Sequence, residues 1–326
     1  MRTEDFYLAS FRLAFLALIL SITGFSAQRS DNQDHRGLKL QPDRSVNKLP
    51  VSSKRWALVV GVDQYDDKRV GQLNGATNDA KALANVLEKT AGFPSHQIVL
   101  LTSDQADDHR ATRASILREL SDLSSVVPED GLLFIAFSGH GIERNQQLFL
   151  LPSDAQVKNV KLLEQTSIPA SLIADWFRMK VKQVLVIIDA CRSNPGTSVG
   201  GVMKGIMPGS SSFNGLGRFI ASLKKSTIDE RNKGVVAFAV LYATEGGHSA
   251  YEDSKNQQGY LTSAVVHALD GEAANTEGDV TLAALLRYVQ DRVPKTATKE
   301  GGSEQRPFYS MEGYKAEDLV LAIIKR

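Results

Sequence analysis

Residues Val184–Cys191 read VLVIIDAC: five apolar residues, then an acid, an alanine and the only cysteine of the 326-residue chain. An apolar run rich in β-branched residues predicts a strand buried on both faces, as in the middle of a parallel sheet. The acid and the thiol then come at the carboxyl end of that strand, where open α/β folds hold their ligands. The stretch predicts an α/β fold with its chemistry at one edge of the sheet.

A second stretch has the same construction. The apolar run Leu132–Phe137 (LLFIAF) leads directly into Ser138-Gly139-His140-Gly141. Two buried strands are therefore expected to end beside each other, one in a histidine and the other in a thiol.

The remaining pattern predicts a doubly wound arrangement. Strands are expected at 56–61, 98–101 and 235–242, and amphipathic helices at 76–90, 112–123, 170–177, 259–269 and 281–293. A last apolar stretch, 319–324, is expected to close the sheet or dock on it. Strands that alternate with helices at these spacings are typical of a parallel sheet covered on both faces.

Composition excludes several classes of function. A net charge of +1 without a basic stripe argues against a nucleic-acid partner. A single cysteine excludes an internal disulfide framework and a multi-cysteine metal site. The usual glycine-rich nucleotide motifs are missing after the predicted strands. We expect no redox cofactor and no metal centre.

The amino-terminal segment predicts export. Leu13–Ile22 (LAFLALILSI) is a ten-residue apolar core preceded by Arg2 and Arg12, and small residues follow it up to Ala27. This pattern is typical of a signal peptide over 1–27, cleaved after Ser26 or Ala27, with a periplasmic or secreted product. An uncleaved anchor is the alternative, and contact with a membrane is expected only in that case. Residues 28–53 are polar and aperiodic, which predicts a flexible linker.

The histidine and the cysteine together predict nucleophilic catalysis. A thiol attacks a carbonyl carbon as the thiolate, so Cys191 needs a base, and His140 is placed to take that proton. The same histidine can later protonate the leaving amine. The backbone amides of Gly141 and Cys191 are candidate donors to the oxyanion. Taken singly, each residue has a plainer interpretation: a buried small side chain for the cysteine, a polar loop residue for the histidine.

The paired motif resembles the caspase-like cysteine peptidases (peptidase C14), and within them the metacaspase and bacterial orthocaspase branch. His140 precedes Cys191 by 51 residues, close to the spacing of the animal caspases. The likeness is strong over 54–195 and looser beyond 235. It implies a three-layer α/β/α sandwich around a mostly parallel, roughly six-stranded sheet. It also implies a large-subunit region at 54–196, a Gly/Ser-rich and then basic linker at 197–233, and a small-subunit region at 234–326 that completes the same sheet.

The resemblance also implies a substrate class. In the metacaspase branch, the primary pocket takes an aspartate two residues before the cysteine, a serine two residues before the histidine and an aspartate that ends an LxGxxND segment. Asp189, Ser138 and the Asp79 of Leu73–Asp79 (LNGATND) match these places. Two carboxylates and a hydroxyl suit a guanidinium or ammonium group. The alternatives are a helix-capping role for Asp79 and a turn role for Asp189.

These observations predict an exported cysteine endopeptidase that cleaves after Arg or Lys through a thioester acyl-enzyme. Its partner would be a peptide or protein with a basic residue before the scissile bond. Self-cleavage within the basic part of 197–233 is a further hypothesis, and an ordinary solvated loop is the alternative.

Three points stay open. Several metacaspases require calcium, and Asp154 matches one member of their ligand set, but the sequence offers no clear set of ligands. A catalytically silent caspase-like module with a binding or regulatory role is the leading alternative function. A flavodoxin-like ligand-binding domain explains the sheet but gives no reason for His140 and Cys191.

Overall fold

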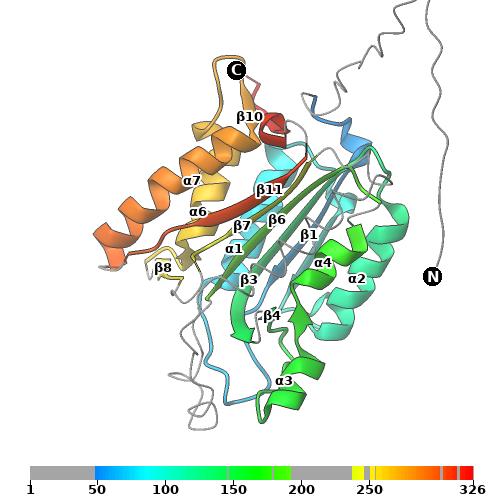
Figure 1. Ribbon diagram of the computed structural model, residues 1–326, viewed down its shortest axis with the longest axis vertical. Coiled ribbons are helices and arrows are strands. Elements are labelled where there is room, and N and C mark those ends of the chain that lie inside the picture. The colour runs from blue at the N-terminus through cyan, green and yellow to red at the C-terminus, as the bar shows by residue number, and fades with distance from the viewer. Residues whose placement is uncertain are drawn as a thin grey trace, which may run out of the picture. The chain divides into compact units, whose positions relative to one another are not determined.

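A sheet with six strands on its main path, in the order β11-β7-β6-β3-β1-β2, runs through the centre of the computed structural model (Figure 1). The structure describes residues 48–144, 147–177, 180–191, 237–245, 250–253, 255–301, 304–313 and 316–325. The five strands from β7 to β2 pair in parallel, and β11 runs antiparallel to β7. Their bounds are β1 Arg55–Gly61, β2 Ile98–Thr102, β3 Leu132–Arg144, β6 Gln183–Cys191, β7 Ala237–Tyr242 and β11 Phe308–Glu312.

Helices cover both faces of this sheet (Figure 1). The face with α2 (Arg113–Val126) and α4 (Ser171–Phe177) buries alternate strand residues such as Val184, Val186 and Ile188. The opposite face, with α1 (Ala76–Lys89), α6 (Tyr260–His267) and α7 (Leu282–Thr296), buries the residues between them, including Leu185 and Ile187. Side chains alternate along a strand, so every second residue faces the same helices. The three-layer α/β/α fold expected from the sequence is confirmed.

The strand order contains a reversal that marks the place for a site. From β1 the chain moves outward to β2, returns to β3 on the other side of β1, and continues to β6 and β7. The carboxyl ends of β1 and β3 therefore border the point where the strand order reverses. Open α/β sheets bind their ligands in the crevice at such a point.

Several elements differ from the sequence-based expectation. β3 does not end at the histidine but continues to Arg144, because its second half pairs with β4 (Gln147–Leu150), which pairs in turn with β5 (Ile168–Pro169). One edge of the sheet is formed by β11, a strand that the sequence did not reveal. The apolar stretch 319–324 leaves the main sheet to form β12 (Val320–Ile323), which pairs with β10 (Asp279–Thr281). The short helix α3 (Val160–Thr166) was also missed.

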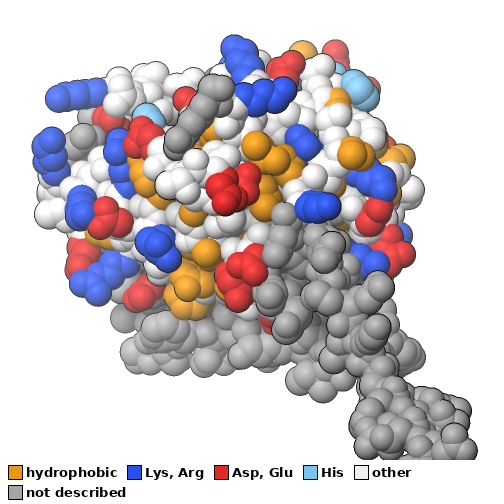
Figure 2. Space-filling model, turned by 90° about the horizontal axis from the view of Figure 1, so that it is seen from above, with side chains coloured by type: hydrophobic (Ala, Val, Ile, Leu, Met, Phe, Trp, Pro, Cys, Tyr) orange, Lys and Arg blue, Asp and Glu red, His pale blue; other side chains and the backbone are white. Residues whose placement is uncertain are grey.

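The face of the molecule seen in Figure 2 shows no dominant charge among the described residues. In the view of Figure 2, acidic and basic side chains are interspersed, in keeping with a net charge of +1. No helix within the described ranges is long and apolar enough to cross a membrane. The expected signal peptide at 1–27 and the linker at 197–233 lie outside the described residues.

Candidate active site

The imidazole of His140 is fixed by the loop 62–75, which connects β1 to α1. Its Nε2 lies 2.9 Å from the carbonyl oxygen of Gly71. A carbonyl only accepts hydrogen bonds, so we assign the ring proton to Nε2 and leave Nδ1 as the free base. Burial lowers the pKa of His140, and the bond to Gly71 opposes that shift. The ring is therefore neutral, and able to accept a proton, near neutral pH.

Strand register brings the two predicted catalytic residues together. His140 of β3 stands directly opposite Cys191 of β6, in a parallel ladder that runs without interruption from Leu132 opposite Gln183. Adjacent strands lie about 4.8 Å apart. The side chain of Cys191 lies outside the described part of the structure.

The pairing of β3 with β4 determines the direction of the Gly141 amide. The N–H of Leu151 donates to the carbonyl of His140 at 3.0 Å, and Gly141 stands opposite Leu150. In an antiparallel ladder this makes Gly141 a residue whose N–H points away from β4. The amide thus faces the side of β3 on which β6 ends at Cys191.

The three predicted pocket residues come together from three different elements. Asp79 lies in the first turn of α1, Ser138 in β3 and Asp189 in β6, and the side chains are 2%, 2% and 7% exposed. Ser138 and Asp189 are opposite each other in the ladder. Side chains alternate along a strand, so Ser138 and Asp189 point to the face of the sheet that is covered by α1 and α6. Asp79 lies on that same face, and the three side chains therefore come together.

Thr262 of α6 and Gly259, which directly precedes this helix, donate hydrogen bonds to the two carboxylates. Thr262 donates to Oδ2 of Asp189 through its backbone N–H at 2.9 Å and through its hydroxyl at 2.7 Å. The N–H of Gly259 donates to Oδ1 of Asp79 at 3.0 Å. These bonds connect residues about 70 and 180 positions apart in the chain, so no local sequence pattern predicts them.

Burial makes the pair of carboxylates costly to ionise. Desolvation raises the pKa of Asp79 well above its ordinary value, and the neighbouring charge of Asp189 raises it further. Desolvation also raises the pKa of Asp189, against the two bonds from Thr262. Within the described part of the chain, no Lys, Arg or His side chain pairs with either acid. The pocket is an electronegative site without an internal counterion among those residues.

Gly259 is required for this packing. A Cβ at that position would stand 2.3 Å from Oδ2 of Asp189 and 3.0 Å from Oδ2 of Asp79. Both distances lie below an ordinary van der Waals contact. The backbone at the start of α6 approaches both carboxylates only because residue 259 has no side chain.

A further carboxylate, Glu252, borders the pocket and was missed from the sequence. It lies on β8 (Glu252–Asp253), which pairs with β9 (Gln258–Gly259). Burial raises the pKa of Glu252, as do the charges of Asp63 and Asp189, while backbone bonds from Asn74 and Gly75 lower it. The β8–β9 hairpin is thus held against the start of α1, and the Nδ2 of Asn78 also donates to the carbonyl of Gln257 at 3.2 Å.

The alternative roles for the two aspartates are wrong. The first amides of α1, those of Ala76 and Thr77, donate to Asp63 at 2.8 and 2.9 Å, so Asp63 and not Asp79 caps this helix. Asp189 lies within a strand and not in a turn.

Asp154, the residue that matches one calcium ligand of the metacaspases, accepts a hydrogen bond from the N–H of Arg113 at 2.8 Å, at the start of α2. Among the described residues, no group of three or more His, Cys, Asp or Glu side chains is arranged to hold a metal ion.

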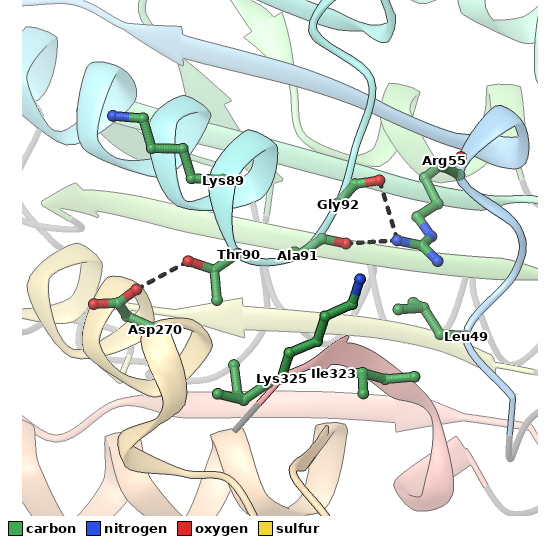
Figure 3. Close-up of a pocket in the computed structure, with 11 residues that line it drawn as sticks. Leu49, Arg55, Lys89, Thr90, Ala91, Gly92, Asp270, Ile323 and Lys325 are labelled. Atoms are coloured by element: carbon green, nitrogen blue, oxygen red, sulfur yellow. Dashed lines mark hydrogen bonds between the residues drawn. The ribbon is translucent and has the colours of Figure 1, made fainter.

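A cavity of about 650 Å³ lies away from this site, by the amino end of β1 (Figure 3). Three of the polar side chains in its lining, those of Arg55, Thr90 and Asp270, form hydrogen bonds within the fold. The Nη1 of Arg55 donates to the carbonyls of Ala91 and Gly92 at 2.7 and 3.1 Å, and the hydroxyl of Thr90 donates to Asp270 at 2.9 Å. Neither His140 nor the acidic pocket contributes to its lining.

Comparison with known proteins identifies the family. Residues 54–315 match the family model for the caspase domain, peptidase C14. The chain belongs to the caspase-domain family. This family consists of cysteine peptidases that act on proteins and peptides, and the predicted resemblance is confirmed.

Individual relatives match this chain over shorter stretches. Metacaspase-1A of Aspergillus oryzae is 38% identical over 88 residues, and metacaspase-1A of Aspergillus fumigatus is 36% identical over 91 residues. These stretches cover 27% and 28% of this chain and only 20% and 22% of the two relatives. The chain thus aligns with about a fifth of the length of these relatives.

Solved structures share the fold at low sequence identity. Protein GSU0716 from Geobacter sulfurreducens has a TM-score of 0.55 at 13% identity, over 83% of this chain and 100% of its own. Caspase-1 from Spodoptera frugiperda has a TM-score of 0.50 at 15% identity, over 82% and 89%. Both show the caspase-like α/β architecture.

The electrostatic cost of the pocket gives a stability prediction. The folded-state pKa of Asp79 is raised above its ordinary value near 3.8, so ionised Asp79 costs stability at neutral pH. Asp79→Asn keeps an oxygen to accept from Gly259 and removes the charge. Its Tm at pH 7 should exceed that of the wild type by at least about 2 °C, the shift that roughly 1 kcal/mol produces in a domain of this size.

The sign of the pH dependence provides the control for this prediction. The wild-type carboxyl becomes protonated as the pH falls through its raised pKa, so the difference in Tm should shrink toward pH 4. Thermal melts of both proteins between pH 4 and 8 measure it. An Asp79→Asn protein with a lower Tm than the wild type at pH 7 would contradict this description of the pocket.

Proposed function

We propose that the chain is a cysteine endopeptidase that cleaves peptide bonds after Arg or Lys. The observation that carries the proposal is the buried pair Asp79 and Asp189, which no described cation neutralises, at the end of the strand that carries Cys191. A guanidinium or ammonium group of a substrate would supply the missing positive charge. An acidic substrate side chain would be repelled from the same place.

The catalytic sequence follows from the assignment of protons at His140. Nδ1 accepts the proton of the Cys191 thiol, and the thiolate attacks the carbonyl carbon of the scissile bond. The amides of Gly141 and Cys191 donate to the resulting oxyanion. The tetrahedral intermediate collapses to a thioester as the C–N bond breaks, and His140 gives its proton to the leaving amine.

Hydrolysis of the thioester reverses these roles. Neutral His140 takes a proton from a water molecule, and the hydroxide formed attacks the thioester carbonyl. The C–S bond breaks, the product leaves as a carboxylic acid, and protonated His140 returns its proton to the Cys191 thiolate. Gly71 holds the Nε2–H throughout, so the ring keeps the orientation that both half-reactions need.

Hydrolysis of short fluorogenic peptides tests the substrate class. Peptides with Arg, Lys or Asp directly before the fluorescent reporter are assayed without added metal and again with calcium. The peptides with Arg or Lys should be cleaved far faster than those with Asp. Cys191→Ala should abolish cleavage. Asp189→Asn should reduce kcat/KM on the basic peptides by about 10- to 100-fold, the range for loss of one hydrogen bond to a charged group.

Two outcomes would contradict the proposal in different ways. Cleavage only after Asp would overturn the pocket assignment and leave the peptidase. No cleavage of any peptide, with no labelling of Cys191 by an Arg-based alkylating inhibitor, would favour a catalytically silent binding module.

Gly259→Ala tests the wall of the pocket without altering a charge. The added methyl group overlaps Oδ2 of Asp189, so we expect kcat/KM on Arg and Lys peptides to fall at least tenfold. The rate of Cys191 alkylation by iodoacetamide should stay within twofold of wild type, because the added methyl group lies against the carboxylates of Asp189 and Asp79.

Gln258→Ala, the preceding residue on β9, is the matched control and should keep wild-type activity. A Gly259→Ala enzyme with unchanged kinetics on basic peptides would show that the basic side chain binds elsewhere.

A further inference from the structure

Tyr65 contacts the catalytic histidine from the loop 62–75, and no sequence motif pointed to it. Its side chain is 2% exposed. The backbone N–H of His140 donates to the Tyr65 hydroxyl at 2.8 Å, and this hydroxyl lies 3.2 Å from the carbonyl of Val62, to which it donates. The hydroxyl therefore accepts and donates at the same time, in an interior that excludes water.

The hydroxyl replaces a missing strand partner. β1 pairs with β3 up to Gly61 opposite Ser138, and the N–H of Val62 donates to the carbonyl of Ser138 at 2.9 Å. Two residues later, the N–H of His140 points the same way, but β1 has ended. A buried N–H without an acceptor is costly, and the Tyr65 hydroxyl satisfies it.

The same loop also determines the plane of the imidazole. The rings of Tyr65 and His140 have centroids 5.2 Å apart at an interplanar angle of 35°. Gly71, six residues after Tyr65, supplies the carbonyl at Nε2. Gly139 leaves room for this contact, because a Cβ there would stand 3.1 Å from the Tyr65 hydroxyl. Backbone, ring face and Nε2 of the histidine are thus all held by one loop.

Hydrogen bonds and an ion pair hold the loop 62–75 in position. The side chain of Gln72 accepts from the N–H of Tyr65 at 3.1 Å and donates to its carbonyl at 3.3 Å. Buried Asp67 accepts from the N–H of Val157 at 2.8 Å and pairs with Arg69 at 2.7 Å. The N–H of Asp66 donates to the carbonyl of Ser153 at 2.8 Å.

We propose that Tyr65 is the positioning residue for the catalytic base: through its hydroxyl and its ring it holds His140 so that Nδ1 faces Cys191. This inference rests on the proposed Cys/His peptidase. Tyr65 acts through His140 and takes no part in binding the basic side chain, which lies on the Asp79 and Asp189 side. The positioning role therefore affects the chemical step and not substrate binding.

Tyr65→Phe removes the hydroxyl and keeps the ring. We expect kcat on an Arg peptide to fall about tenfold with KM within twofold, and iodoacetamide to alkylate Cys191 at least fivefold more slowly at pH 7. Since Cys191 is the only cysteine, the label reports on that thiol alone. The matched control is Tyr288→Phe on α7, which removes a hydroxyl bonded to Glu272 and should leave kcat, KM and the alkylation rate unchanged.

Gln72→Ala is the second test variant if Tyr65→Phe does not fold, because it loosens the loop from its exposed side. It should lower kcat about threefold and leave KM unchanged. For whichever variant folds, kcat and an alkylation rate within 1.5-fold of wild type, or a kcat that falls only in proportion to the folded fraction measured by circular dichroism, would overturn the positioning role. A wild-type protein that cleaves no peptide would refute the proposed function instead, and the alkylation rates would still report on the His140–Cys191 pair.

Discussion

The parallel pairing of β3 with β6 in one register is the interaction on which the site depends. It places His140 opposite Cys191 and Ser138 opposite Asp189. A shift by one residue would turn every side chain of one strand to the other face of the sheet. Burial of Leu185 and Ile187 against one helical layer, and of Val184, Val186 and Ile188 against the other, makes such a shift unfavourable. The hydrophobic core thus holds the predicted catalytic residues opposite each other, and likewise two of the predicted pocket residues, Ser138 and Asp189.

Around this ladder, the structure places groups that are unfavourable for stability. Two carboxylates are buried side by side, with Glu252 close enough to raise the pKa of Asp79. Hydrogen bonds from Gly259 and Thr262 offset part of that cost. Native proteins tolerate such costs chiefly at functional sites. The arrangement is easiest to explain if a cationic side chain completes the pocket.

Much of the fold and part of the site could be predicted from the sequence. Apolar runs and helical periodicity located β1, β2, β3, β6 and β7, and the position of Asp189 after the run 184–188 indicated a site at the strand end. β11 escaped notice because Phe308–Glu312 is an edge strand with half-buried residues and no apolar run. The extension of β3 past His140 depends on its pairing with β4, which local pattern does not encode.

The residues missed around the site share one property. Tyr65, Gly259, Thr262 and Glu252 act through contacts with residues far away in the chain, and none of them has a distinctive local spacing. The resemblance to metacaspases supplied Asp79 and Ser138, but not the groups that hold them. Tertiary contacts, unlike motifs, have to be seen in three dimensions.

A crystal structure of the protein after reaction with an Arg chloromethyl ketone tests the central claim most directly. The account predicts a bond from Sγ of Cys191 to the inhibitor, Nδ1 of His140 beside that sulfur, and the guanidinium between the carboxylates of Asp79 and Asp189. A guanidinium that lies in solvent, or against other residues, while Cys191 is alkylated would contradict it.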